Sequence, residues 1–448
     1  MSIPYSRGAK WRKWDLHVHT PASYDYKDKS ISNDTIIDSV FDNDLSIVAI
    51  TDHHTIDVER INELQKIGEE KGVVVLPGIE FLSDARGSDP IHFIGIFPEN
   101  CNLVYVWGQI KNRTAISKIE GESKKINEVY CDLAETAEII HGLGGIVTIH
   151  AGSKSHSIEN ITHALPHSAA QKEDIAKFVD IFELGKERDI EEYKNKVVNF
   201  LKQKINKTHP LILCSDNHNA NKYQLKINCW LKADPTFNGL KQVLIEPEGR
   251  IFIGDKPPLF NRIAKNRTRY IKKLSITQVE GYDERQGVWF KNVSIPLNSE
   301  LVAIIGNKGS GKSAIADVLA LCANYQSNDD FSFLKTKKFK EKNLAENFTA
   351  SITWESESPP VEINLNEQSE NTELGVKYLP QGQFERLTNE IRTAEKFQRE
   401  IESVVFSHIP KSENLGARSF DELIEKKTSS VNSELESLKS DIRDITWV

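Results

Sequence analysis

Seven short apolar runs in the first half of the chain constrain its fold more than any other feature. Each run carries or adjoins side chains that bind metal ions, and stretches with helical spacing and polar faces separate the runs. Alternation of short strands with helices predicts parallel strands joined by right-handed crossovers. Ligands at the ends of seven strands favour a barrel with its site at that rim, because an open sheet would gather them near one switch point.

The first run contains Asp15-Leu-His17-Val-His19, in which strand periodicity would put all three polar side chains on one face. One such His-x-His pair is weak evidence for a metal site, but the theme recurs. The other runs are 46–50 before Asp52, His53 and His54; 73–76 before Glu80; 91–97, which begins near His92; 146–149 before His150; 178–182 before Glu183; and 211–214 before Asp216 and His218. Imidazoles mixed with carboxylates suit Zn, Mn or Fe, so we expect a metal centre built from several strands.

The second half of the chain carries a different motif. Strand-like runs at 271–279, 288–295 and 301–305 lead into an eight-residue match to G-x-x-x-x-G-K-S, followed by a helical stretch at 314–322. The matching residues are Gly306, Asn307, Lys308, Gly309, Ser310, Gly311, Lys312 and Ser313. This pattern predicts a loop whose backbone amides hold nucleotide phosphates, with Lys312 on the terminal phosphates and Ser313 on Mg²⁺.

The composition of the chain and the position of its prolines predict its domain boundaries and its location in the cell. A basic, proline-containing stretch at 257–269 reads as a linker, which divides the chain into 1–258, 259–418 and a charged helical segment at 419–448. The net charge is −8, so the overall charge of the chain does not indicate nucleic-acid binding. A local basic groove is still compatible with such binding. The five cysteines are scattered, and we find neither a signal peptide nor a membrane-spanning run, so we expect a cytoplasmic protein.

Over residues 12–255 the ordered motifs resemble the PHP (polymerase and histidinol phosphatase) superfamily. The resemblance implies a distorted seven-stranded β/α barrel that holds two or three divalent ions (Mn, Zn or Fe) and hydrolyses phosphoesters. It implies the metal ligands His17, His19, His53, Glu80, His92, His150, Asp216 and His218, with Asp25 near the position of a further family ligand. Glu80 would bridge two ions.

Four further residues are assigned to catalysis. Asp15 and Asp52 are expected to orient neighbouring imidazoles, His54 to face substrate, and Glu183 to act at the end of its strand. Lys154, Lys186 and Arg188 follow the fifth and sixth strands and are candidate phosphate clamps.

Residues 377–384, Lys-Tyr-Leu-Pro-Gln-Gly-Gln-Phe, resemble the Q-loop of SMC-like and RecF-like ABC ATPases, in which Gln381 would reach Mg²⁺. That resemblance implies ATP with Mg²⁺, homo-oligomers formed through ATPase heads, and work on nucleic acid, DNA more than RNA. We find no Leu-Ser-Gly-Gly signature and no apolar run ending in Asp-Glu, so this chain alone is expected to bind ATP poorly and hydrolyse it slowly.

Together these features predict metal-dependent phosphodiester hydrolysis, a nuclease activity gated by an ATPase module. Proteins of this arrangement resemble phage-defence and DNA-maintenance factors. Two alternatives stay open: a phosphomonoesterase acting on a nucleotide or sugar phosphate, and an ATP or nucleic-acid sensor in which the metals serve structure alone.

Overall fold

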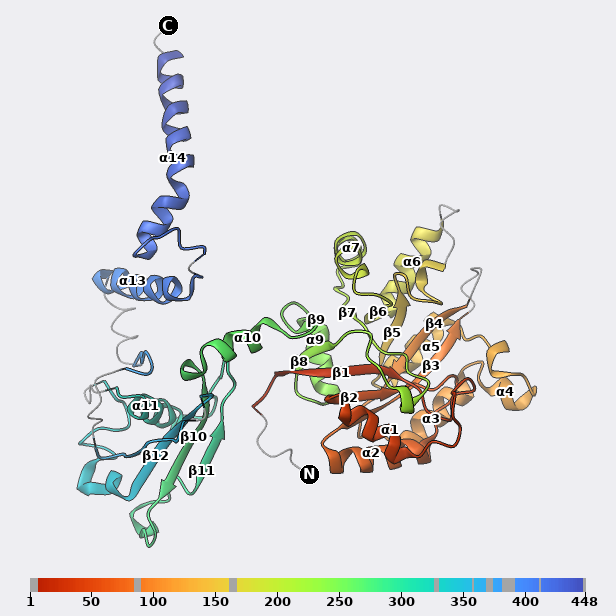
Figure 1. The fold of residues 1–448 in the computed structure, drawn as a ribbon, viewed down its shortest axis with the longest axis horizontal. Coiled ribbons are helices and arrows are strands. Elements are labelled where there is room, and N and C mark those ends of the chain that lie inside the picture. The colour runs from red at the N-terminus through yellow and green to blue at the C-terminus, as the bar shows by residue number, and fades with distance from the viewer. Residues whose placement is uncertain are drawn as a thin grey trace. The chain divides into compact units, whose positions relative to one another are not determined.

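A computed structural model describes residues 7–83, 90–160, 167–325, 330–356, 358–367, 374–380, 391–410 and 412–445 (Figure 1). The chain divides into two compact units. Unit 1 comprises Met1–Tyr270 and Pro296–Leu301, and unit 2 comprises Ile271–Ile295 and Val302–Val448. The stretch expected to be a linker, 257–269, lies entirely within unit 1. None of the described helices is long and apolar enough to cross a bilayer.

Unit 1 is an α/β unit built on one curled, nine-stranded mixed sheet with the order β7-β6-β5-β4-β3-β2-β1-β8-β9. Its strands are β1 (Lys10–Val18), β2 (Leu45–Ile50), β3 (Val74–Ser83), β4 (Ile91–Ile96), β5 (Ile146–Ala151), β6 (Ile181–Leu184), β7 (Leu211–Ile212), β8 (Cys229–Ala233) and β9 (Ile251–Ile253). The first seven correspond to the seven apolar runs, whereas the closing strands β8 and β9 were not predicted.

Strand direction departs from the expected all-parallel arrangement at β4. This strand pairs antiparallel with both β3 and β5, while β1, β2 and β3 run parallel to one another, as do β5, β6 and β7. The reversal explains why His92 lies at the start of its strand. The first residues of an antiparallel strand share a rim with the last residues of its neighbours.

The sheet nearly closes where the end of β1 meets the segment after β7. Val18 and Asn217 form a parallel bridge, His19 donates its backbone N–H to the Asn217 carbonyl at 3.0 Å, and Asp216 donates to the His17 carbonyl at 3.1 Å. These contacts join the first and seventh strands at the rim that carries the predicted ligands. A barrel-like sheet results, as the sequence predicted.

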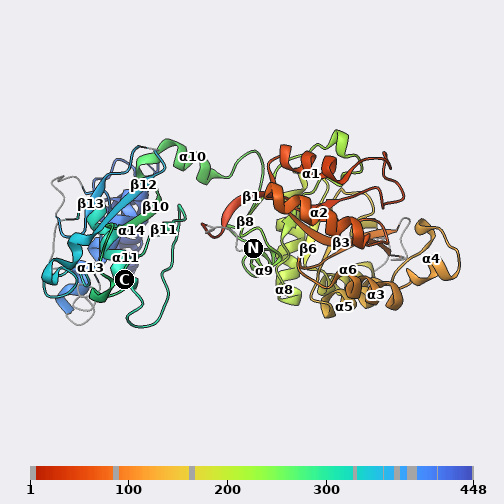
Figure 2. The same ribbon diagram turned by 90° about the horizontal axis from the view of Figure 1, so that it is seen from below.

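Helices cover the outside of this sheet (Figures 1 and 2). They are α1 (Asn33–Asp42), α2 (Val58–Lys71), α3 (Leu103–Arg113), α4 (Ser117–Gly121), α5 (Leu133–Gly142), α6 (His167–Phe178), α7 (Asp189–Tyr193) and α8 (Asn199–Ile205). Two further helices do not cover this surface: α9 (Phe237–Ile245) packs on the inner face of the sheet, and α10 (Pro258–Lys265), which follows β9 along the chain, has no buried residue. In the order α1, α2, α3, α5, α6, α8 each contacts the next. Side-chain caps fix several starts, for example Asp57 Oδ1, which accepts from the backbone of Arg60 at 3.1 Å.

Two apolar cores lie on the two faces of the strands. The outer core packs the sheet against the surrounding helices and includes Val48 and Val75. The inner core fills the barrel and includes Ile47 and Leu76, and α9 contributes Leu240 to it. Because side chains alternate along a strand, the inner positions continue upward from this core to the ligand-bearing rim.

Unit 2 contains a four-stranded sheet with the order β11-β10-β12-β13 and three described α-helices. Its elements are β10 (Ile271–Gln278), β11 (Val293–Pro296), β12 (Phe348–Trp354), β13 (Glu362–Asn364), α11 (Lys312–Cys322), α13 (Ile391–His408) and α14 (Phe420–Ile445). The strand expected at 301–305 is not formed. The segment has no sheet partner among the described residues, and Leu301 and Ile305 are each 89% exposed.

Candidate metal centre

Nine ligand-type side chains meet at the rim of the barrel, and we call this group the metal centre. Strand alternation turns two of them inward: Leu76, Gly78 and Glu80 succeed one another on the inner face of β3, and Ile146, Thr148 and His150 do so on β5. The nine are His17, His19, Asp25, His53, Glu80, His92, His150, Asp216 and His218. Every ligand expected from the sequence is therefore placed in one group.

Glu80 lies at the middle of the metal centre. One carboxylate oxygen is 3.2 Å from a ring nitrogen of each of His17, His19 and His53. The other oxygen is 2.6 Å from His92 and 3.5 Å from His150. A buried carboxylate among five imidazoles is the arrangement expected of a ligand shared between cations.

Two further carboxylates close the sides of the metal centre. Asp216 Oδ1 lies 3.4 Å from His17 Nε2 and 3.5 Å from His19 Nε2. Asp25 Oδ2 lies 3.4 Å from His53 Nε2 and 3.1 Å from His218 Nε2. Asp25, which the family resemblance placed near a further ligand position, thus contacts two of the other candidate ligands.

The donor set fits divalent cations. Several ring nitrogens point toward one another: His17 Nε2 and His19 Nε2 are 3.0 Å apart. The buried Nε2 of His150 has no hydrogen-bond partner among the described residues. Four groups of three ligand atoms, each within 4.8 Å of one another, are present: His19, His53 and His218; His17, His150 and Asp216; His17, His19 and Glu80; and His53, Glu80 and His92. Imidazole and carboxylate in these proportions suit Zn, Mn or Fe.

Electrostatics at the metal centre favour ionised carboxylates. Burial alone would raise the pKa of Glu80, but His17, His53 and other imidazoles hold it well below the usual value. Burial would likewise lower the pKa of His19, whereas hydrogen bonds to Asp216 and Glu80 raise it to about 9. Buried negative charge of this kind is stable only when cations compensate it.

Glu183, at the end of β6, holds His17 from behind. Its carboxylate oxygens lie 3.0 and 3.2 Å from His17 Nδ1, so that Nε2 points into the metal centre. The buried ammonium of Lys154 lies beside the same carboxylate and 3.2 Å from Asp216. Carboxylates in this position fix the tautomer and direction of a ligand imidazole, the role that the sequence assigned to other residues.

Asp15 does not face the metal centre, in contrast to the sequence prediction. Trp14 and Leu16 belong to the inner core and Val18 to the outer core, so the alternation of β1 breaks between Leu16 and Val18, where the pairing with β2 shifts register. This irregularity turns His17 and His19 inward and leaves Asp15 on the other face. There the Asp15 carboxylate accepts from Ser215 N at 3.1 Å and from the Tyr223 hydroxyl.

Asp52 also contacts no imidazole by hydrogen bond. It accepts from the backbone N–H and the hydroxyl of Thr20, both at 2.7 Å, and fixes the turn after β1. Ser23 in that turn is the residue that holds His19, with its hydroxyl 2.8 Å from Nδ1, and it also accepts from His53 N at 3.0 Å. The sequence carried no signal for Ser23, because a serine in a turn is common.

His54 lies in the wall of the barrel instead of facing a substrate. Its Nε2 accepts from Leu82 N at 3.3 Å, and its ring packs edge-on against Phe81. Burial and neighbouring His53 lower the pKa of His54 to about 4, so the ring is neutral at physiological pH. The contacts are those of a structural histidine, which corrects the expectation from sequence.

The metal centre opens into a cavity of 390 Å³, which we call the metal-side arm. Besides ligands, its wall includes Tyr24, Asn127, Ser155 and His156. The His156 ring stacks on that of His92 with 4.4 Å between centroids, so this loop histidine lies at the site.

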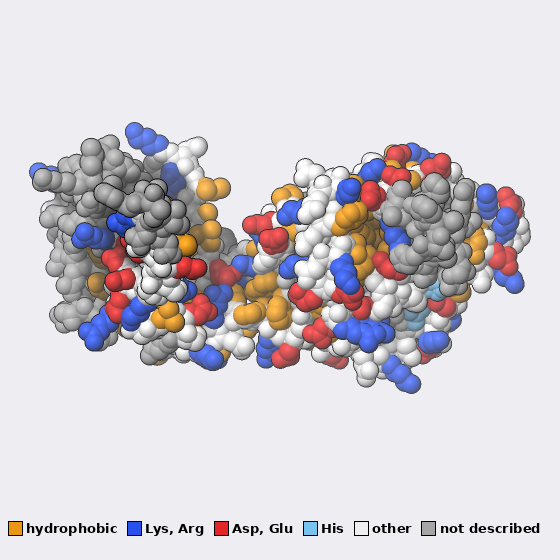
Figure 3. Space-filling model, turned by 90° about the horizontal axis from the view of Figure 1, so that it is seen from above, with side chains coloured by type: hydrophobic (Ala, Val, Ile, Leu, Met, Phe, Trp, Pro, Cys, Tyr) orange, Lys and Arg blue, Asp and Glu red, His pale blue; other side chains and the backbone are white. Residues whose placement is uncertain are grey.

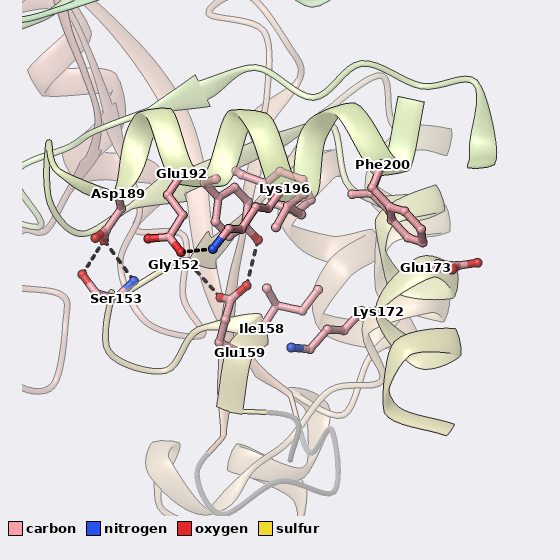
Figure 4. Close-up of a pocket in the computed structure, with 14 residues that line it drawn as sticks. Gly152, Ser153, Ile158, Glu159, Lys172, Glu173, Asp189, Glu192, Lys196 and Phe200 are labelled. Carbon is pink, nitrogen blue, oxygen red and sulfur yellow. Dashed lines mark hydrogen bonds and ion pairs between the residues drawn. The ribbon is translucent and has the colours of Figure 1, made fainter. Parts of the chain in front are cut away.

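A separate cavity of 470 Å³ is lined by residues that include Gly152, Ser153, Glu159 and Lys196 (Figure 4). Several polar groups of its wall are paired with one another or with the backbone: Lys196 with Glu192, Tyr193 with Glu159, and Asp189 with Ser153. None of the nine residues of the metal centre lines it.

In unit 2 the glycine-rich loop precedes α11 as expected. Gly309 and Gly311 adopt positive φ angles of 84° and 92°, and Lys312 Nζ donates to the carbonyls of Gly306 and Asn307 at 2.8 Å. The lysine therefore folds back over its own loop. Gln381 lies outside the described residues.

No protein-family profile and no curated protein sequence matches this chain. Among solved structures it is similar to a lesion-specific endonuclease, PfuEndoQ of Pyrococcus furiosus (17% identity, 61% of this chain, 64% of that chain, TM-score 0.38). It is also similar to an Endonuclease Q in complex with a 27-mer duplex that carries an abasic lesion (16%, 54% and 58%, TM-score 0.38). A third is a two-domain protein of Bacteroides vulgatus containing a predicted PHP-like metal-dependent phosphoesterase (14%, 66% and 86%, TM-score 0.37). The functional proposal below is therefore based on the residues of the metal centre.

Proposed function

We propose that unit 1 is a metal-dependent hydrolase of phosphoesters, acting on phosphodiesters. The observation that carries the proposal is the convergence of six imidazoles and three carboxylates on one opening at the rim of a barrel, with Glu80 at their middle. His17, His19, His53, His92, His150 and His218 would hold divalent ions together with Asp25, Glu80 and Asp216. When bound, such ions neutralise charge on phosphate oxygens and activate water near neutral pH.

The chain's own residues have distinct parts in this reaction. Hydrolysis breaks the P–O bond to the leaving group and forms one to the oxygen of water, and the water's protons pass to solvent bases and to the leaving oxygen. Glu183 keeps His17 turned toward the reacting phosphate. The ammonium of Lys154, held by Glu183 and Asp216, supplies a fixed positive charge beside the metal centre.

The test is hydrolysis by metal-depleted protein before and after addition of Mn²⁺, Zn²⁺ or Fe²⁺. We expect bis(4-nitrophenyl) phosphate to be cleaved only after metal is restored, and the His17→Ala/His19→Ala variant to stay inactive. Because those histidines are buried, Asp216→Asn, which alters a partly exposed ligand, is a second variant, and exposed Asp42→Asn is the control. Circular dichroism reports whether each variant keeps the fold.

The two alternatives give different results in the same assay. Turnover of 4-nitrophenyl phosphate but of no diester would make the protein a phosphomonoesterase. Unfolding of the metal-depleted protein, with no turnover of either compound after reloading, would assign the metals to structure and overturn the proposal.

We further propose that the loop Gly306–Ser313 binds the phosphates of ATP and that nucleotide binding regulates cleavage. The supporting observation is the glycine-rich loop with positive φ angles directly before α11. Oligomers formed through this unit, DNA as the polymer cleaved, and a role in phage defence or DNA maintenance belong to the same proposal.

A further inference from the structure

A second cavity adjoins the metal centre. It measures 460 Å³ and shares two wall residues, Ser155 and Asp216, with the metal-side arm. The remaining wall contains Ser153, Lys154, Lys186 and Lys226, and we call this cavity the lysine arm. The metal centre thus opens on two sides, with Asp216 between them.

The lysine arm carries unbalanced positive charge. Lys154 is buried, and its ammonium lies between the carboxylates of Glu183 and Asp216. Lys186 and Lys226 are exposed in loops after β6 and before β8, and within the described part of the chain neither ammonium has an ion-pair partner. Glu187 and Asp216 are the two carboxylates of this wall, so its three lysines exceed its acidic residues by one positive charge.

This charge is local. On the face shown in Figure 3, acidic and basic side chains are interspersed over unit 1, and the whole chain carries a net charge of −8. A phosphate is therefore attracted most strongly where the ammonium groups of Lys186 and Lys226, unpaired among the described residues, face the same cavity. The charge and position of the lysine arm therefore suit a second phosphate group of the substrate, next to the phosphate that is hydrolysed at the metal centre.

The metal-side arm offers a different surface. Tyr24 is 44% exposed at its mouth, with its ring centroid 5.1 Å from that of His53. Exposed aromatic rings beside basic residues are the usual means of holding unpaired nucleobases and the backbone that joins them.

We propose that the two arms hold one nucleic-acid strand across the metal centre: Tyr24 stacks on a base on one side, and Lys186 and Lys226 bind the neighbouring phosphate on the other. The proposal rests on the hydrolase function proposed above and identifies its substrate as an internal phosphodiester of a polynucleotide. A phosphomonoester would have no use for the lysine arm.

The test compares chromogenic diesters that differ only in a second phosphate. One pair is thymidine 5′-(4-nitrophenyl phosphate) with and without a 3′-phosphate, and the other is thymidine 3′-(4-nitrophenyl phosphate) with and without a 5′-phosphate. In one pair we expect the second phosphate to raise kcat/KM of the wild type about tenfold at low salt. The ratio of kcat/KM with the second phosphate to kcat/KM without it should fall to about one in Lys186→Ala/Lys226→Ala. Lys222 is exposed and lies outside the lysine arm, so Lys222→Ala should keep the wild-type ratio.

Three further measurements sharpen the result. The slope of log KM against log salt for a thymidine decanucleotide should fall by about one for each lysine removed. Glu187→Gln should raise the ratio, because it removes the opposing charge. Tyr24→Ala should weaken binding of the decanucleotide about tenfold.

Each outcome decides a separate point. Two results would show that the lysine arm does not bind a phosphate: diester hydrolysis whose kcat/KM does not rise with a second phosphate, or a rise that persists in the double variant. Either result would leave the proposed hydrolase function unchanged. Inhibition by thymidine 3′,5′-bisphosphate as strong as by the decanucleotide would identify a small bisphosphate as ligand and reject the polynucleotide. No turnover of any compound after metal loading removes the hydrolase and this inference together.

Discussion

At the residue scale, the metal centre depends on side chains that are not ligands. Ser23 and Glu183 each contact the Nδ1 of one histidine, and this leaves Nε2 of His19 and His17 directed at Glu80. The sequence predicted nine ligands that the structure brings together, because ligand types recur at strand ends, and their binding of metal stays a prediction. It misassigned the supporting residues Asp15 and Asp52, because support depends on local backbone irregularity that periodicity does not encode.

Glu183→Gln tests this support. The amide keeps the size of the side chain but removes the charge behind His17 and beside Lys154. We expect metal affinity and kcat/KM to fall about 10–100-fold, while the fold persists. Metal titration followed by hydrolysis of bis(4-nitrophenyl) phosphate measures both quantities.

Glu191→Gln, on the exposed surface of α7, is the matched control. Wild-type metal affinity in Glu183→Gln would show that the carboxylate does not position the imidazole. Loss of affinity only in proportion to lost folded protein, measured by circular dichroism, would assign Glu183 to stability.

At the scale of elements, β4 is the part of the barrel that sequence reasoning misread. Its apolar run and flanking signals resemble those of its parallel neighbours, and hydrophobic pattern alone does not reveal strand direction. Direction follows from the short connection between β3 and β4, since parallel neighbours need a crossover of a dozen residues or more. The sequence clue was His92, which lies at the start of its strand and not the end.

Gly78 marks the point where β3 changes from a parallel to an antiparallel partner. A Cβ atom there would lie 2.9 Å from Thr51 Cγ2 and 3.0 Å from the carbonyl oxygens of Ile50 and Gly95. We expect Gly78→Ala to lower the free energy of unfolding by about 1–3 kcal/mol, because two backbone groups cannot yield easily. Urea denaturation measures the change.

Gly108→Ala in α3 is the control, because a Cβ atom there meets nothing within 4 Å. Alanine is the better helix former, so this variant should gain up to about 1 kcal/mol. Equal stability of wild type and Gly78→Ala would refute close packing at this crossing.

At the scale of the whole molecule, sequence and structure agree most where a motif carries its own geometry. The barrel-like sheet and the ligand set follow from repeated strand-end signals. Unit 2 is different: an apolar run at 301–305 predicted a strand, but a strand exists only with a partner to share its hydrogen bonds. Patterns within one segment cannot supply that partner.

Nucleotide binding by unit 2 is a prediction for the full chain. Titration with Mg-ATP should show weak binding that Lys312→Ala abolishes and exposed Lys337→Ala retains, with hydrolysis slow or undetectable. Equal binding by wild type and Lys312→Ala would refute the loop assignment, and rapid hydrolysis would refute the expectation that this chain alone is a poor ATPase.

Closure of the barrel also has a consequence for synthesis. Ser215 and Asp15 hydrogen-bond across 200 residues, and Asp216 joins His17 only when the seventh strand reaches the first. A nascent chain that has not yet released residue 218 from the ribosome therefore lacks part of the ligand set. The proposed hydrolase activity would therefore begin only after the seventh strand has joined the first.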